Sequence, residues 1–168
     1  MVHISLTTSS RLMNHLPIKF GVLSLNLSRA QRAQERSTTM KDFIYKLADY
    51  IKELELEYPI KIGIFDDSSS LVIRPLTGSE TIREYMDGTV DSRLPFEISI
   101  KSKNQEEAYN VLGTVMNHVR NISDFLKYSE DDTHVLLNVV IDQIPTFQEN
   151  TDSYFYYTSR LTVDLTVV

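Results

Sequence analysis

The spacing of apolar residues changes along this chain from helical to alternating and back, and this pattern constrains the fold most. Over residues 41–54 apolar side chains recur every three or four positions, as on one face of a helix: they are Phe43, Ile44, Leu47, Ile51 and Leu54. Thr38 or Thr39 can cap the start of this helix. Pro59 forbids further helix and favours an extended conformation for Tyr58.

Residues 59–76 have the spacing of β-strands. Three isoleucines alternate with other residues, the sequence DDSSS then has the composition of a turn, and LVIRPL follows it. The pattern predicts a β-hairpin over residues 59–76, with Pro75 at the end or the edge of its second strand.

Residues 77–94 follow neither spacing, and Gly78 and Gly88 interrupt them. Connections in compact domains are usually about 4–6 residues long. This segment is therefore either a functional loop or a loosely held hairpin arm, and one segment can be both. Gly88 allows the sharp turn that an extended arm needs.

The clearest strand is PFEISIKS at residues 95–102, where apolar and polar residues alternate so that one face is buried. Asn104 suits the N-cap of a second helix, with Glu107 as its capping-box partner. The helix itself is predicted over residues 105–125 from an apolar stripe, which consists of Ala108, Val111, Leu112, Val115, Val119 and Ile122.

Two strands close the chain. HVLLNVVIDQI at residues 134–144 is rich in β-branched residues and stops at Pro145. The last strand, residues 154–168, alternates in its second half, where the inward residues are Leu161, Val163, Leu165 and Val167. The element order is α-β-β-β-α-β-β. Burial of all these apolar faces predicts an α+β fold, a mostly antiparallel four- to five-stranded sheet with both helices packed on one face.

Charge divides the chain near Met40. Residues 1–39 carry five Lys or Arg against one Glu, so +5 − 1 = +4, and the whole chain carries −6, which leaves −10 for residues 40–168. Residues 1–39 are therefore interpreted as an N-terminal extension and residues 40–168 as the domain. The extension is a flexible tail, sequence upstream of the true start, or a targeting segment.

The composition excludes several classes of function. An acidic domain binds phosphate backbones poorly, so no nucleic-acid specificity is expected. No apolar run reaches the roughly 20 residues of a membrane span, and the absence of cysteine excludes thiolate metal sites and a cysteine nucleophile. Tyr154, Tyr156 and Tyr157 lack interleaved Lys or Arg, so they are interpreted as packing residues rather than base-stacking ones.

The sequence contains no catalytic motif. No two of its four histidines have zinc-ligand spacing. His118 is interpreted as a residue on the flank of the second helix, and His134, near Asp131 and Asp132, as part of a solvated turn rather than a metal site. We therefore expect no catalytic, cofactor-binding or metal-binding residues, and a binding or assembly protein rather than an enzyme.

Three strings resemble one protein family: MKDFIYKLADYI at residues 40–51, YMDG at 85–88 and LPFEISIKSKNQEEAYNVL at 94–112. From Met40 to Val168 the chain resembles the small minor capsid or tail-terminator-like proteins of tailed bacteriophages and prophages of Gram-positive bacteria. The last of the three strings is the most specific.

The resemblance implies a structural virion protein at the head–tail junction. Tail terminators form rings, usually hexamers, that cap the tail tube, end its polymerisation and support head joining. The implied partners are further copies of the chain, the tail tube protein and a head-completion or stopper protein, with no cofactor and no membrane. The protein would be made in the host cytoplasm and built into the tail or neck of the virion.

The segment at 77–94 is too long for a connector and its mixed charges offer no core face, so we expect it to reach a neighbouring subunit or the tail tube. The expected contact residues are Arg83, Tyr85, Asp87 and Arg93. Three alternatives stay open: another neck or minor capsid connector protein, a small monomeric regulatory binding domain, and a small enzyme such as a hydrolase that uses acidic loop residues.

Overall fold

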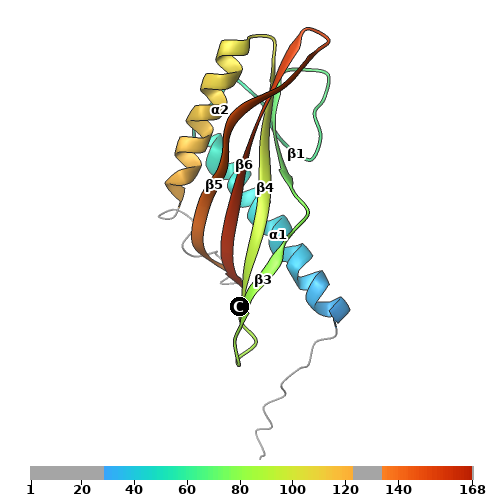
Figure 1. The fold of residues 1–168 in the computed structure, drawn as a ribbon, viewed down its shortest axis with the longest axis vertical. Helices are drawn as coiled ribbons and strands as arrows, with labels where there is room; N and C mark the ends of the chain where they lie inside the picture. The colour runs from blue at the N-terminus through green and yellow to red at the C-terminus, as the bar shows by residue number, and fades with distance from the viewer. Residues whose placement is uncertain (1–28, 123–133, 168) are drawn as a thin grey trace, which may run out of the picture.

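The computed structural model describes residues 29–122 and 134–167, and the side chains from Lys41 onward within them. These residues form two helices and six strands (Figure 1). In chain order they are α1 (Arg29–Lys52), β1 (Ile60–Ile62), β2 (Ser70–Pro75), β3 (Glu80–Glu84), β4 (Val90–Ser102), α2 (Gln105–Arg120), β5 (His134–Thr151) and β6 (Tyr154–Val167).

The strands form one sheet in the order β1-β2-β4-β6-β5, and β3 pairs with β4 as well. β4 is the central strand because its first residues pair with β3, its later residues pair with β2, and its whole length pairs with β6 on the other side. All pairs are antiparallel except β1 with β2.

Both helices pack on the same face of the sheet and share one core (Figure 1). The stripe of α1 buries Phe43, Leu47 and Ile51 against this face, and the stripe of α2 buries Leu112 and Val115. The sheet contributes the inward residues of its central strands, which include Leu71, Ile73, Phe96, Ile98, Ile100, Leu161, Val163 and Leu165. The predicted α+β fold with two helices on one face is confirmed, and the sheet has one strand more than expected.

The first helix begins earlier than the sequence predicted. α1 starts at Arg29, so Thr38 and Thr39 lie inside the helix and do not cap it. No Gly or Pro occurs between Arg29 and Lys52, and Ala, Gln, Glu and Arg favour helix at its start. Helix propensity therefore favours the early start, and the first buried apolar side chain among those described is Phe43.

The second helix has the predicted N-cap. The Asn104 side-chain oxygen accepts hydrogen bonds from the backbone N–H groups of Glu106 and Glu107 at 3.1 and 3.3 Å. In a capping box the Glu107 side chain would accept a hydrogen bond from the Asn104 N–H. Here the Asn104 N–H donates to Ser102 Oγ instead, at 3.1 Å. α2 ends at Arg120 rather than at residue 125, which lies outside the described residues.

His118 joins the two helices. Its ring stacks on Tyr50 of α1 with 4.0 Å between the centroids. The Tyr50 hydroxyl donates to the His118 carbonyl at 3.3 Å, and His118 Nε2 lies 3.2 Å from the Tyr50 carbonyl. The flank position predicted for this histidine is correct, and its contacts fix the crossing of α1 and α2.

The predicted β-hairpin over residues 59–76 is wrong, because β1 and β2 pair in parallel, with Ile60 opposite Leu71. The connection turns at Gly63, whose φ of +102° favours glycine. It then crosses the face of the sheet that the helices leave open, where Phe65 packs edge-on against Tyr156 of β6 with 5.4 Å between the centroids. The connection therefore returns the chain to the end of the sheet where β1 starts, and β2 runs parallel to β1.

Pro145 does not end the strand that contains it. β5 continues to Thr151, and the pairing with β6 shifts register between Gln143 and Thr146. β5 lies at the edge of the sheet and, among the described strands, pairs only with β6. A proline and a bulge are tolerated in an edge strand, because the missing N–H need not donate to a second neighbouring strand. A two-residue turn then leads into β6, with positive φ angles of 52° and 65° at Asp152 and Ser153.

Candidate assembly interface

Residues 77–94, expected to lack regular structure, form a β-hairpin from β3 and the start of β4. Its turn is closed by the bonds from Gly88 N–H to the Tyr85 carbonyl at 3.1 Å and from Tyr85 N–H to the Thr89 carbonyl at 2.9 Å. Gly88 has a φ of +93°, as the last residue of a three-residue hairpin loop requires. The segment therefore has the form of a hairpin arm, which was one of its two compatible interpretations.

The hairpin presents apolar side chains to solvent at its end. Met86 is fully exposed, and Ile82 and Tyr85 are 46% and 40% exposed. The guanidinium of Arg83 lies 5.8 Å from the centre of the Tyr85 ring. Exposed apolar residues grouped in this way are typical of protein–protein contacts. We call Arg83, Tyr85 and Met86 the hairpin tip.

Two bonds hold Tyr85 in place while leaving its ring accessible. The Tyr85 hydroxyl donates to Asp91 of β4 at 2.8 Å, and Thr166 of β6 donates to the second oxygen of the same carboxylate at 2.7 Å. The tip is therefore tied to the sheet through a side-chain network and is not a loose arm.

The structure gives Asp87 and Arg93 roles inside the chain. The Asp87 carboxylate accepts the backbone N–H of Thr89 at 3.0 Å, and the hydrogen bonds from Thr89 lower the pKa of Asp87. Arg93 binds both oxygens of Asp164 at 2.8 and 3.2 Å and Glu80 at 3.2 Å, and Asp164 raises the pKa of Arg93. Of the four expected contact residues, Arg83 and Tyr85 contact each other, Asp87 lies exposed in the turn beside them, and Arg93 lies further along β4.

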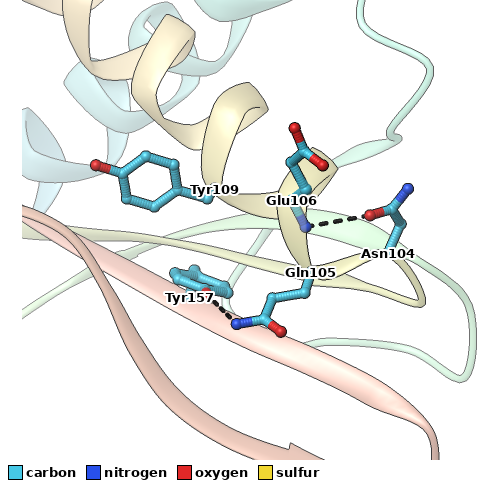
Figure 2. A pocket seen from close by; sticks show the side chains of 5 residues that line it. All are labelled: Asn104, Gln105, Glu106, Tyr109 and Tyr157. Atoms are coloured by element: carbon cyan, nitrogen blue, oxygen red, sulfur yellow. Dashed lines mark hydrogen bonds between the residues drawn. The ribbon is translucent and has the colours of Figure 1, made fainter.

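A second surface lies at the other end of the long axis, where α2 begins (Figures 1 and 2). A hollow of about 450 Å³ is lined by Asn104, Gln105, Glu106, Tyr109 and Tyr157. Gln105 donates to the Tyr157 hydroxyl at 3.0 Å, as Figure 2 shows. The Tyr157 ring contacts Tyr109 and Phe147 edge-on, with centroids 6.0 and 5.6 Å apart. We call this site the aromatic hollow.

Sequence reasoning missed the aromatic hollow because its residues come from α2, β5 and β6. Tyr109 and Phe147 are each 47% exposed, whereas Tyr157 is buried. Tyr109 follows the buried Ala108 and lies outside the apolar stripe of the helix, which is the one signal that the sequence carried.

The connection between β1 and β2 covers the open face of the sheet at the same end. Lys101, which is 7% exposed, donates to the Asp66 carbonyl at 2.8 Å and lies 4.3 Å from the centre of the Tyr154 ring. The Asp66 carboxylate pairs with Lys61, and this bond lowers the pKa of Asp66 to about 2. Tyr154 is thus engaged within the chain, as the packing interpretation predicted.

Metal binding and membrane spanning find no support among the described residues. Among them no group of three or more His, Asp or Glu residues could hold a metal ion. The expectation of a solvated His134 is wrong, because its side chain is 1% exposed and burial lowers its pKa, with Lys46 adding to the effect and Asp42 opposing it. Asp131 and Asp132 lie outside the described residues. Neither described helix is long and apolar enough to cross a bilayer.

Comparison with known proteins gives one result. No curated protein matches the chain. A family model described as "Bacteriophage tail terminator protein" matches residues 44–165, which run from the first buried turns of α1 to the end of β6 and include both the hairpin and the aromatic hollow. This family is a structural one and places the chain among the components of phage tails. Since the match covers most of its length, the chain belongs to the bacteriophage tail terminator protein family.

Proposed function

We propose that this protein caps the tail tube of a phage as a closed ring, ends polymerisation of the tube and supports joining of the head. The family match over residues 44–165 carries the proposal. The ring is expected to be a hexamer, and its partners are further copies of the chain, the tail tube protein and a head-completion protein.

The shape of the protein supports a role between two partners. In Figure 1 the turn of the β3–β4 hairpin and the start of α2, whose residues line the aromatic hollow, lie at opposite ends of the long axis, so the two ends differ in chemistry. A ring of identical subunits needs two different complementary patches on each copy, because a head-to-tail contact closes only when one patch meets the other. The chain therefore has the kind of surfaces that such a ring uses.

In this proposal the hairpin tip contacts a neighbouring subunit or the tail tube. Substitutions of Arg83 and Tyr85 test this contact best. Asp87 shapes the turn and Arg93 ties the hairpin to β6, so their removal would alter the fold locally as well as any contact. Exposed charges and aromatic rings at such sites set register and partner choice.

The test is electron microscopy of phage particles assembled with altered protein. Without the protein, we expect tubes of uncontrolled length and heads that lack tails. The double variant Arg83→Ala/Tyr85→Ala should give the same defects while its melting temperature stays near the wild-type value. The matched control is Tyr45→Ala/Arg120→Ala, which removes the same two residue types from exposed positions on the helices.

Two results would count against the proposal. Tails of normal length on joined heads, made without the protein, would overturn the capping function. Normal particles from the Arg83→Ala/Tyr85→Ala variant would remove the hairpin tip from the interface but leave the capping function standing.

A further inference from the structure

The hairpin tip and the aromatic hollow cannot meet within one copy. They lie beyond opposite ends of β4, which has 13 residues and so spans about 40 Å. Each carries an apolar side chain open to solvent, since Met86 is fully exposed and Tyr109 is 47% exposed, and the hollow also has the polar lining residues Asn104, Gln105 and Glu106.

The two surfaces have complementary side chains. A methionine is flexible and polarisable, and its sulfur makes favourable contacts with the edges of aromatic rings. Two such rings, those of Tyr109 and Tyr157, line the hollow, and Phe147 packs edge-on against Tyr157 beside it. The fully exposed Met86, in a turn closed by two backbone hydrogen bonds, therefore has the chemistry of a residue that packs against the exposed Tyr109 ring at the hollow.

The charges around the two surfaces are complementary as well. Among the described residues no carboxylate pairs with Arg83, whose guanidinium contacts only Tyr85 of its own hairpin. Glu106 lines the hollow, and its backbone rather than its carboxylate makes the bond drawn in Figure 2. A cation three residues before Met86 and a carboxylate three residues before Tyr109 would attract each other across a contact.

We propose that the hairpin tip of one copy docks in the aromatic hollow of a second copy, and that this contact joins successive subunits of the ring. Met86 packs in the hollow against the exposed Tyr109 ring, and Arg83 pairs with Glu106 of the neighbour. The contact is heterologous, so each copy gives its tip to one neighbour and its hollow to the other. The inference rests on the proposed ring and names the surfaces that build it.

Cross-linking tests the contact directly, because the natural chain has no cysteine. In the full chain, the double variant Met86→Cys/Tyr109→Cys should form, under mild oxidation, a ladder of covalent oligomers on a denaturing gel. Met86→Cys or Tyr109→Cys alone should give dimers at most. The control Met86→Cys/Ile64→Cys pairs the tip with a side chain that is 80% exposed in the connection after β1, and it should give no ladder.

Charge reversal gives an independent measurement. Arg83→Glu and Glu106→Arg should each weaken self-association by about tenfold or more in analytical ultracentrifugation, and the double variant should recover most of the loss. Met86→Ser should weaken it to a similar degree, and Ile64→Ser should leave it unchanged. Melting temperatures near the wild-type value show that each variant is folded.

The outcomes separate this contact from the capping function. The inference is overturned when the cysteine pair gives only the products of its single variants, when the charge reversals fail to rescue each other, or when the wild-type chain stays monomeric at all concentrations. Purified protein that shortens growing tail tubes without the ladder keeps the capping function and loses this contact. A ladder without any effect on the growth of tail tubes keeps this contact and loses the capping function.

Discussion

Substitution of Val115 tests the core that holds the two helices to the sheet. Val115 is fully buried on α2 between Leu112 and Val119. Val115→Ala removes two methyl groups at about 0.8 kcal/mol each and leaves a small cavity, so the free energy of unfolding should fall by about 2 kcal/mol. Val115→Asp adds an acid to this loss. Keeping a carboxyl neutral at pH 7, about 3 pKa units above its ordinary value, costs about 4 kcal/mol more.

The aspartate variant should therefore lose about 6 kcal/mol at pH 7, which is comparable to the roughly 5–15 kcal/mol of a typical domain, and should be largely unfolded. The pKa of the introduced carboxyl is raised in the folded state, so this penalty is present at pH 7 and disappears as the pH falls toward about 4. Val115→Asn has the same shape without the charge. We expect the two variants to differ by about 4 kcal/mol at pH 7 and to agree near pH 4.

Urea unfolding followed by circular dichroism at pH 4 and pH 7 measures these differences. Thr114→Asp is the matched control, because Thr114 is exposed on the same helix and its replacement should change the unfolding free energy little. A Val115→Asp protein with the wild-type midpoint at pH 7 would refute the placement of Val115 in the core. Equal losses for the Asp and Asn variants at both pH values would refute the ionisation argument.

Three further predictions concern the N-terminal segment, a buried histidine and the covered sheet face. A chain that starts at Met40 should keep a cooperative melting transition, because the buried described side chains of α1 begin at Phe43, and an unfolded circular dichroism spectrum would contradict this. The pKa of His134 is lowered in the folded state, so stability should be complete above about pH 6.5 and decrease as the pH falls below it; His134→Gln should flatten this dependence in urea titrations, and an unchanged slope would exclude His134 as its source. Lys101→Met removes the bond to the Asp66 carbonyl, so backbone amides of the connection after β1 should exchange faster with deuterium, while wild-type exchange rates would show that Phe65 alone holds it.

The sequence predicted the core of this protein well because burial imposes a period on the chain. The stripes of α1 and α2 and the alternation in β4 and β6 each select one buried face, and the structure buries most of the expected residues in one cluster. Leu54 and Val111 are partly buried against the cluster, and Val167 is half-buried outside it. The N-cap at Asn104 was predictable for a local reason as well, since its partners lie two and three residues away.

Pairing direction was not predictable, because parallel and antiparallel strands share the same alternation. The direction of β2 relative to β1 depends on contacts between distant residues. Lys101 of β4 binds the Asp66 carbonyl, and Tyr156 of β6 packs against Phe65. The composition DDSSS correctly indicated a turn, but the path of the chain around it is set by β4 and β6, which come much later in the sequence.

The same limit applies to the interface. A sequence shows that Met86 precedes an Asp-Gly pair, but its full exposure follows from the hairpin geometry that Gly88 permits. The aromatic hollow exists only when the pairing of β5 with β6 brings Phe147 against Tyr157, whose ring in turn contacts Tyr109 of α2. Neither contact leaves a local pattern in the sequence, because its members belong to different elements.

The edge strand β5 and the hairpin tip both expose apolar side chains, but they differ in how well they are protected against contact with other chains. The edge strand β5 is 18 residues long and exposes Leu137 and Ile144, which would invite uncontrolled strand addition. Pro145 removes a donor beside Ile144, and register shifts along β5 bend the edge away from a flat template. The hairpin tip has no such protection, and its turn is rigid. The proposed ring would gain from this division, because edge pairing can continue without limit whereas a contact between one tip and one hollow per copy can close a ring.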